Sequence, residues 1–292
     1  MKIKKTIKFC LGRFFPVTYS KILFYIRQGY KLNLKSPVSF NEKLMWLKIN
    51  NYYNNKLVWR CSDKLLVREY AKEKGIKDKN LTKIYGVYQN AEQINYNDLP
   101  RKFALKCSHG CGFNIICNDK KNFDKTLANK KLNKWIKEKF GFASAENHYT
   151  HIKPNIFSEE YIDSNIGFPY DYKLYCFFGK PKLVLVCSSR EENLRLNFFD
   201  LNWNELLYGK KEYRNTNKIN KPTKLNEMIE YAKILSKDFP FVRVDFYEYN
   251  NRVILGEMTF TPAQCTATYY SDLGNDELSK MLDISDLVEH KK

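Results

Sequence analysis

The spacing of hydrophobic residues changes along the chain and predicts both helices and strands. In residues 223–237, apolar side chains recur every three or four positions, the period of an amphipathic helix. The apolar face of this helix consists of Leu225, Met228, Ile229, Ala232 and Leu235. Residues 241–249 and 252–259 have the composition of strands, and Asn250-Asn251 between them is typical of a tight hairpin turn with positive φ. We therefore expect a helix followed by an antiparallel hairpin.

The rest of the chain continues this mixture of elements. A second hairpin is predicted from residues 172–178 and 181–188, joined at Gly179-Lys180. Pro16 and Pro37 are expected to break the N-terminal helices. Further helices are expected within 1–60, 62–75 and 124–140, and further strands within 81–96, 103–106, 113–117 and 155–162.

Composition and charge restrict the class of protein. The 292 residues are 43% hydrophobic and 15% aromatic, which excludes a disordered polymer. The net charge is +18, and residues 1–60 contain 13 Lys and Arg against a single acid, Glu42. Such a cluster can bind nucleic acid, an anionic membrane surface or an acidic polymer, or it can be a solvated basic face. We expect no nucleic-acid partner, because the basic residues lack an RNA-type aromatic motif.

The N-terminal region has no signal for export or membrane insertion. No apolar stretch approaches the about 18–20 residues of a membrane span, so a cytoplasmic protein is expected. Residues 1–37 mix basic and apolar side chains, so they can lie on the inner face of the membrane as a peripheral contact, or pack on the rest of the protein. Most of the eight cysteines lie in apolar runs and are expected to be reduced core residues.

Four polar residues of the last hairpin form the first candidate site. Arg243 and Asp245 are two positions apart on one predicted strand, so they point to the same face. Glu257 and Thr259 have the same spacing on the other strand, and the turn lies midway, so the two pairs can face each other. Two neighbouring carboxylates repel unless a cation joins them, and Mg²⁺ binds carboxylate oxygens together with substrate phosphates. The alternative is a solvent-exposed polar face in which Arg243 pairs with an acid.

A second candidate site is a glycine-containing loop. Lys106 ends an apolar strand and is followed by His109, Gly110 and Gly112. The ammonium group and the backbone N–H groups of such a loop can hold phosphates. The segment is neither a Walker A sequence nor a Rossmann fingerprint, and His109 can equally be an ordinary loop residue.

Taken in order, these segments resemble the ATP-grasp enzymes. That family has a Lys before its central domain, matched by Lys64, and a second Lys before a flexible glycine loop, matched by Lys106. Its adenine-binding connection reads acid-acid-aromatic-aliphatic, as Glu159-Glu160-Tyr161-Ile162 does. A further acid, which often reaches the ribose, is matched by Asp171.

The family's signature also includes R-x-D, a hairpin, and E-x-N-x-x-P. Arg243-Val244-Asp245 and the segment from Glu257 to Pro262 match it, with Thr259 where Asn is usual. Within ATP-grasp, the chain closely resembles the TupA-like branch, named for teichuronopeptide biosynthesis, from residue 38 to 280. The matching words are Ser39-Phe40-Asn41-Glu42-Lys43-Leu44, Leu105-Lys106-Cys107-Ser108-His109-Gly110, Asp171-Tyr172-Lys173, Phe241-Val242-Arg243-Val244-Asp245 and Gly256-Glu257-Met258-Thr259-Phe260.

The resemblance implies an α+β fold of the ATP-grasp type, in which two α+β subdomains clamp ATP behind an N-terminal, mainly helical extension. The implied divisions are a basic helical region (1–60), an N-terminal and central subdomain with the glycine loop (61–158), and a C-terminal subdomain with the metal site (159–292). It also implies the cofactors ATP and Mg²⁺.

The resemblance assigns roles to individual residues. The residues implied to bind ATP are Lys64, Lys106, Gly110, Gly112, Glu159, Glu160, Tyr161, Ile162, Asp171 and Lys173. The implied metal ligands are Asp245, Glu257 and Thr259, and the implied catalytic residues are Arg243, Lys106 and His109. The two Lys residues would neutralise phosphate charge, Arg243 would stabilise the transferring phosphoryl group, and the loop at His109 would close over the phosphates.

The implied activity is that of a carboxylate–amine ligase acting through an acyl phosphate. TupA-like proteins tend to sit among genes for capsule or cell-surface polysaccharide synthesis, so the substrates would be a uronic-acid carboxylate, free or in a lipid-linked precursor, and an amino acid or amine. Two alternatives stay open. One is a capsular glycosyltransferase, a label some of these proteins carry, although no clear D-x-D motif is present. The other is a kinase of the same fold that phosphorylates a sugar intermediate.

Overall fold

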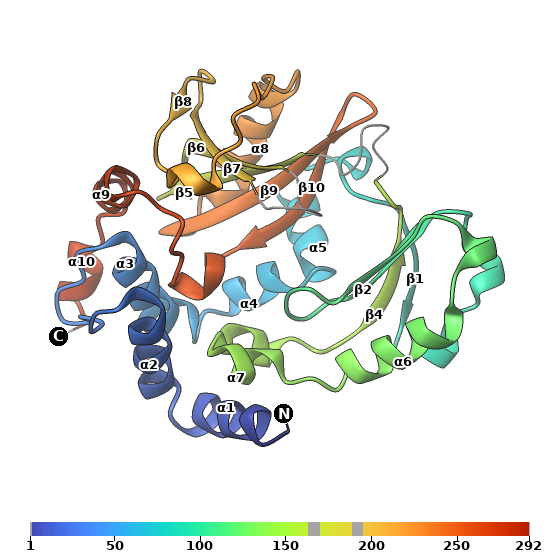
Figure 1. Ribbon diagram of the computed structural model, residues 1–292. Coiled ribbons are helices and arrows are strands. Elements are labelled where there is room, and N and C mark those ends of the chain that lie inside the picture. Colours follow the sequence, from blue (N-terminus) through green and yellow to red (C-terminus); the bar gives the residue numbers. More distant parts are fainter. Residues whose placement is uncertain (1, 163–169, 189–194, 292) are drawn as a thin grey trace.

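The computed structural model describes residues 2–162, 170–188 and 195–291, and it consists of two antiparallel sheets with helices around them (Figure 1). The helices are α1 (Lys2–Phe14), α2 (Pro16–Gln28), α3 (Phe40–Leu47), α4 (Lys56–Ser62), α5 (Leu66–Glu73), α6 (Lys125–Trp135), α7 (Phe140–Ser144), α8 (Leu225–Ser236), α9 (Asp272–Met281) and α10 (Ser285–Glu289). The strands are β1 (Ile84–Tyr88), β2 (Phe103–Cys107), β3 (Asn114–Cys117), β4 (Ile156–Glu159), β5 (Asp171–Phe177), β6 (Lys180–Ser188), β7 (Arg195–Asp200), β8 (Glu205–Leu206), β9 (Phe241–Tyr249) and β10 (Arg252–Thr259). The expected α+β class is confirmed.

The larger sheet has six strands in the order β10-β9-β5-β6-β7-β8. Both expected hairpins are present in it, as the pairs β5–β6 and β9–β10. Successive side chains of a strand point to opposite faces. Helix α8 contacts β5, β6 and β9, while Phe40 of α3 packs its ring against Tyr175, Phe177 and Phe241 of the sheet. Strand β10 is left as an edge strand beside the smaller sheet.

The smaller sheet has four strands in the order β1-β4-β2-β3 and its own hydrophobic core. Phe103 and Leu105 of β2 point into this core, where they meet Ala128 and Leu132 of α6. Apolar residues of α4 and α5 belong instead to the core of the larger sheet, so the chain leaves that core only after Leu81. The division 1–60, 61–158 and 159–292 remains a prediction, but part of its second segment packs with the third.

The N-terminal helices begin and end where the sequence signals indicate. Pro16 occupies the first turn of α2, where a missing N–H is tolerated. Ser39 and Glu42 form a capping box at the start of α3, because each side chain accepts a hydrogen bond from the other's backbone N–H. A π-helix, Lys48–Tyr52, continues α3. In the described part of the chain, no helix is both long and apolar enough to cross a membrane.

One expected helix is shorter than its sequence pattern. The lysine-rich segment was expected to be helical over 124–140, but α6 ends at Trp135. The aromatic ring of Phe140 packs edge-on against Tyr149 and against Phe113. These tertiary contacts draw the chain away from the axis of α6 and start the short helix α7. All eight cysteines are free, and six of them are buried, as expected for core thiols.

Candidate functional site

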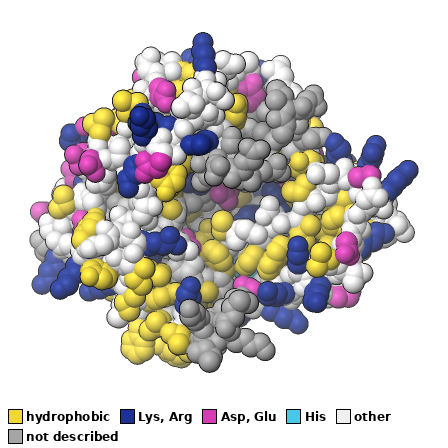
Figure 2. Space-filling model, in the orientation of Figure 1, with side chains coloured by type: hydrophobic (Ala, Val, Ile, Leu, Met, Phe, Trp, Pro, Cys, Tyr) yellow, Lys and Arg dark blue, Asp and Glu magenta, His cyan; other side chains and the backbone are white. Residues whose placement is uncertain are grey.

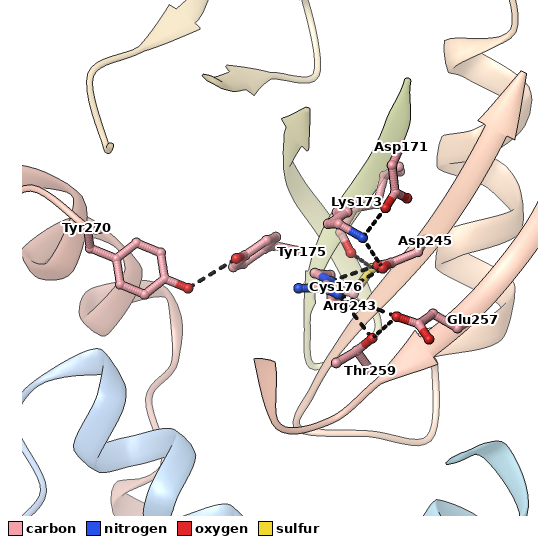
Figure 3. A network of polar contacts seen from close by, with 10 residues as sticks. Asp171, Lys173, Tyr175, Cys176, Arg243, Asp245, Glu257, Thr259 and Tyr270 are labelled. Atoms are coloured by element: carbon pink, nitrogen blue, oxygen red, sulfur yellow. Dashed lines mark hydrogen bonds and ion pairs between the residues drawn. The ribbon is translucent and has the colours of Figure 1, made fainter. Parts of the chain in front are cut away.

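The polar residues of β5, β9 and β10 share one face of the larger sheet. Strand pairing places Glu257 opposite Asp245, and Thr259 opposite Arg243. On the other side of β9, Lys173 is opposite Asp245. Directly paired residues of neighbouring strands point to the same face, so these five side chains meet, as Figure 3 shows.

A β-bulge at Gly256 makes this meeting possible. At the turn, Arg252 pairs with Tyr249, and this register extends to the pair of Leu255 with Phe246. The register then shifts by one residue. Without the shift Glu257 would pair with a neighbour of Asp245 and point to the opposite face, because a slip of one residue reverses every side chain.

Asp245 is the centre of a buried ion-pair network (Figure 3). Its Oδ1 accepts from Arg243 Nε at 2.7 Å and its Oδ2 from Arg243 Nη2 at 2.8 Å, a bidentate arrangement. The same Oδ2 accepts from Lys173 Nζ at 2.5 Å, and Lys173 also pairs with Asp171. Burial alone would disfavour the charged guanidinium, but the carboxylate of Asp245 outweighs it and raises the pKa of Arg243. The network holds two cations and two carboxylates almost without solvent.

Glu257 is the carboxylate of this face that is open to solvent. Its side chain is 41% exposed, against 2% for Asp245. Its Oε1 accepts from the Thr259 hydroxyl at 3.1 Å, and Thr259 accepts from Arg243 Nη2 at 3.1 Å. Partial burial opposes ionisation, but the charges of Lys64, Lys173 and Arg243 outweigh it and lower the pKa of Glu257 to about 2. Glu257 is therefore a permanent anion at neutral pH.

The donor set of this face fits a hard divalent cation. Glu257 and Thr259 supply oxygen donors that point to one another, and such oxygens are what Mg²⁺ takes together with phosphates and water. Asp245 is close by, and its Oδ2 is engaged by both Arg243 and Lys173, while its Oδ1 accepts from Arg243 alone. Among the described residues, no group of three His, Cys, Asp or Glu side chains has the arrangement of a metal site. A metal ion here would thus depend on ligands from a bound molecule.

A cavity lies beside this face, between the smaller sheet and β10. Its polar walls are Lys64, Arg68, Thr82, Lys106, Asn114, Glu159, Glu160 and Glu257. Its apolar walls are Val67, Leu81, Ala104, Ile116, Phe157, Tyr161, Ile162, Tyr247 and Leu255. The alternation of β2 explains part of this lining, because Ala104 and Lys106 face the cavity while Leu105 faces the core. A flat apolar ring with a polyanionic chain attached fits such a cavity, since apolar walls adjoin Lys and Arg.

Lys106 and Glu159 form a second polar network in the cavity. Lys106 pairs with Glu159, whose other oxygen accepts from the Thr82 hydroxyl at 2.6 Å. Arg68 donates to Thr82 at 3.0 Å. Burial would raise the pKa of Glu159, but Lys106 outweighs it and the pKa is lowered. Sequence reasoning missed Arg68 and Thr82; the one available signal was that Arg68 follows Lys64 by four residues, about one helical turn.

The glycine loop contacts the segment that carries Lys64. Lys64 Nζ donates to the carbonyl of Gly110 at 2.5 Å, and its backbone N–H donates to Ser108 at 3.1 Å. Gly110 and Gly112 have φ of 82° and 77°, a conformation that favours glycine. The loop thus reaches from the smaller sheet to the start of α5, where it can cover the cavity.

Eight residues implied by the resemblance do not line the cavity: His109, Gly110, Gly112, Asp171, Lys173, Arg243, Asp245 and Thr259. Two of them, His109 and Asp171, are buried in other contacts. His109 is 3% exposed, and its Nε2 lies 3.2 Å from the carbonyl of Glu138. Burial lowers the pKa of His109, which favours a neutral, packed ring. Asp171 is 2% exposed and pairs with Lys173. In this conformation His109 supports the loop, and Asp171 supports Lys173; their catalytic and ribose-binding roles remain predictions.

Comparisons with known proteins give one family and one fold. The family model for TupA-like ATP-grasp proteins matches residues 42–282. D-alanine–D-alanine ligase from Bacillus anthracis is 14% identical, with a TM-score of 0.50 over 80% of this chain and 70% of that chain. The corresponding ligase from Helicobacter pylori is 18% identical, with a TM-score of 0.41 over 77% of this chain and 62% of that chain. No curated protein matches the sequence.

Proposed function

Because this chain belongs to the TupA-like ATP-grasp family, we propose that it is an ATP-dependent ligase that joins a carboxylate to an amine. The observation that carries the proposal is the solvent-open Glu257, held by Thr259 and Arg243 at the edge of the cavity that Lys64 and Lys106 line. Lys64 and Lys106 are suited to bind a polyphosphate. The Glu257 carboxylate is suited to bind a metal ion that is coordinated by that polyphosphate. ATP supplies the polyphosphate together with an aromatic ring for the apolar walls.

We propose a place for each part of the nucleotide from the residues that line the cavity. We place the adenine ring against Phe157, Ile116 and Ile162, with the backbone of the Glu159–Ile162 segment at its polar edge. Lys106 and Lys64 would then face the phosphates, and Lys106 would leave Glu159 to do so. The Gly110 carbonyl that now accepts from Lys64 would be released in the same step, which would free the glycine loop to close.

The chemistry takes place at the edge strand. Glu257 and Thr259 would hold Mg²⁺, which would supply positive charge to the phosphates of the bound nucleotide. Arg243 is fixed by Asp245, so its guanidinium can stabilise the phosphoryl group without reorganising. Lys173 would contribute a second fixed cation to this end of the site.

The reaction balances in two steps. The substrate carboxylate attacks the γ-phosphorus, the bond to the β-phosphate oxygen breaks, and ADP leaves with an acyl phosphate remaining. The neutral amine then attacks the acyl carbon, phosphate leaves with the bonding electrons, and the amine loses a proton to give the amide. A closed glycine loop would exclude water, which would otherwise hydrolyse the acyl phosphate. For the carboxylate we propose a uronic acid in a cell-surface polysaccharide or its lipid-linked precursor.

The first test measures ADP release. Purified protein with Mg·ATP is incubated with a uronic acid and a mixture of amino acids, and the product mass is determined. We expect ADP release that needs both substrates, stops when EDTA removes the metal, and accompanies formation of an amide. A product that gains a phosphate instead would support the kinase alternative. Consumption of a UDP-sugar without ATP would contradict the ligase proposal and support a glycosyltransferase.

A membrane contact is the second part of the proposal. Helices α1 and α2 leave several large apolar side chains exposed among basic residues, and Figure 2 shows hydrophobic side chains gathered at the lower edge, over these helices. The exposed apolar residues are Ile7, Phe14, Phe15, Val17, Ile22, Tyr25, Ile26 and Tyr30. The described side chains from Thr6 to Gln28 include no acid. We propose that this surface rests on anionic lipid, where a lipid-linked substrate would also be found.

Vesicle binding tests this surface. We expect the protein to co-sediment with vesicles that contain anionic lipid. Binding should weaken as the salt concentration rises, because salt screens the attraction between the basic side chains and the anionic lipid. The double substitution Phe14→Ser and Ile26→Ser should weaken binding about tenfold, since two exposed apolar side chains are lost from the contact. A control, Leu207→Ser with Leu273→Ser, alters two apolar residues elsewhere that are also more than half exposed. Equal binding by both double variants would contradict the proposed surface.

A further inference from the structure

Arg68 holds the point at which the chain passes from the larger sheet to the smaller one. It lies on α5, whose buried residues belong to the core of the larger sheet. The chain leaves that core after Leu81 and enters β1 at Ile84. Between them, the Thr82 hydroxyl oxygen accepts from Arg68 Nη1 at 3.0 Å, and the Thr82 carbonyl accepts from Arg68 Nη2. Arg68 is thus fixed to the segment that joins the two sheets.

Thr82 connects Arg68 to Glu159 in the nucleotide cavity. The Thr82 hydroxyl donates to Glu159 Oε2 at 2.6 Å. Because the oxygen of that hydroxyl already accepts from Arg68, its hydrogen is directed to the carboxylate. The other oxygen, Glu159 Oε1, pairs with Lys106. Glu159 therefore lies between two cations, one in direct contact and one that acts through a hydroxyl.

The two cations differ in their freedom to move. The side chain of Lys106 is 31% exposed and lines the cavity, so its ammonium can turn to a ligand. The side chain of Glu159 is only 7% exposed and is held by Thr82, so it stays in place. Both terminal nitrogens of Arg68 are engaged by Thr82. Arg68 is therefore the cation that remains beside Glu159 when Lys106 leaves.

Departure of Lys106 would leave a buried carboxylate without its ion pair. Such a carboxylate is strongly destabilising unless other charges and hydrogen bonds compensate it. Burial raises the pKa of Glu159, but Lys106, Thr82 and Arg68 together lower it below its ordinary value. Thr82 and Arg68 would continue to stabilise the anion after Lys106 has gone. They therefore make it easier for Lys106 to exchange Glu159 for another anion.

We propose, on the premise that this cavity binds ATP, that Arg68 is a positioning residue for Lys106. Through Thr82 it keeps Glu159 as a compensated anion, so that Lys106 can move to the phosphates of the nucleotide. Arg68 does not bind the phosphates itself, because its guanidinium is turned to Thr82. Its role thus differs from that of Lys64 and Lys106, whose ammonium groups would contact the phosphates.

The test measures how tightly the full chain binds Mg·AMP-PNP, a nucleotide that is not hydrolysed, by isothermal titration calorimetry. Arg68→Met should weaken binding at least about tenfold, because Lys106 then remains the only cation beside Glu159 and is retained there. Arg68→Lys keeps the charge and can still donate to the Thr82 hydroxyl. Its affinity should therefore lie within about threefold of that of the original protein.

Glu159→Gln separates positioning from direct phosphate contact in a double-mutant cycle. The neutral amide needs no compensating cation, so Arg68→Met should weaken Mg·AMP-PNP binding less than about threefold when Glu159→Gln is already present. If Arg68 bound the phosphates itself, its loss would weaken binding by the same factor with either side chain at position 159. A role of Arg68 in folding alone would also show no such dependence.

Two further variants complete the design. Arg60→Met is the matched control, because Arg60 lies on the neighbouring helix α4 and forms a bidentate pair with Glu73, away from the cavity; it should leave the affinity unchanged. If Arg68→Met fails to fold, Thr82→Val decides, because it interrupts the chain at the hydroxyl and keeps both charges. We expect it to weaken Mg·AMP-PNP binding at least about threefold, and to have no further effect when Glu159→Gln is present.

The outcomes separate this inference from the ligase proposal. If Arg68→Met binds Mg·AMP-PNP as well as the original protein does, or loses the same factor in both backgrounds, the positioning role is wrong while the nucleotide site stands. Loss of all binding in Glu159→Gln alone would equally contradict it, because the ligand would then need the carboxylate that Lys106 is proposed to leave. If the original protein binds no Mg·AMP-PNP, the ligase proposal itself fails.

Discussion

Glu257→Gln is expected to reduce ATP turnover at least about a hundredfold, the scale on which single preorganised charge-stabilising groups act. Gln keeps the size and one oxygen of Glu257, but it loses the negative charge among Lys64, Lys173 and Arg243. Without that charge, a metal ion and three cations would share this edge of the cavity with one carboxylate fewer to compensate them. ADP release under saturating Mg·ATP measures the effect.

The fold should tolerate this substitution. Glu257 is 41% exposed, and its carboxylate accepts one hydrogen bond that Gln can also accept. A folded-state pKa of about 2 lies below the unfolded value, so the stability that the charge contributes is present above pH about 4 and is lost as pH falls toward 2. We therefore expect unchanged circular dichroism at pH 7, and we expect that any loss of activity of the original protein between pH 7 and 5 arises from another group.

The matched control lies on the same hairpin. Glu248 is on β9 near the turn, three residues after Asp245, and it accepts from the Thr223 hydroxyl. Glu248→Gln changes the same functional group nearer the turn, so turnover should stay within about twofold of the original protein. Near-normal turnover of Glu257→Gln with Mg²⁺ would show that the metal site is assigned to the wrong residue.

We expect Lys173→Met to lower the free energy of unfolding by about 3–5 kcal/mol, more than any other substitution proposed for this protein. Lys173 pairs with both Asp171 and Asp245, and each of these carboxylates has only 2% of its side chain exposed. Met fills the same space but removes the charge that both carboxylates share. Asp245 would retain Arg243, and Asp171 would lose its ion pair with Lys173. Urea unfolding monitored by circular dichroism measures the free energy of unfolding, with the slope checked for two-state behaviour.

A second substitution separates charge from packing. Asp171→Asn combined with Lys173→Met removes one anion with the cation, so the double variant should regain part of the lost stability. Lys74→Met is the exposed control, because Lys74 pairs with Asp238 at the surface and such pairs contribute about 1 kcal/mol or less. The interpretation of the buried network would be wrong if Lys173→Met lowered the free energy of unfolding no more than Lys74→Met does.

Much of the fold could be predicted from local patterns. The hairpins β5–β6 and β9–β10 and the helix α8 lie close to their expected positions. Strand alternation alone placed Arg243 with Asp245, because side chains two residues apart point the same way whatever the surroundings. Each of these predictions depends only on residues that are close together in the chain, and the sequence gives these residues directly.

The register of the last hairpin could not be predicted in the same way. A two-residue turn at Asn250-Asn251 sets Glu257 on the wrong face, and only the bulge at Gly256 brings it opposite Asp245. The conclusion that the two pairs face each other was therefore correct, but the turn alone does not cause it. The bulge places Gly256 under the ring of Tyr247, where a side chain would approach within 2.9 Å. A contact of this kind exists only after the strands have paired.

The sequence by itself determined most of the chemical groups of the proposed site and their order along the chain, because motif, spacing and family resemblance depend only on the order of residues; Arg68 and Thr82 were added by the structure. Only the tertiary structure decided which of these groups are open and which are engaged. It buried Asp245 between Arg243 and Lys173 and left Glu257 exposed. Burial and pairing depend on segments that are distant in the chain. The sequence alone therefore does not show which of the charged groups are accessible to a ligand.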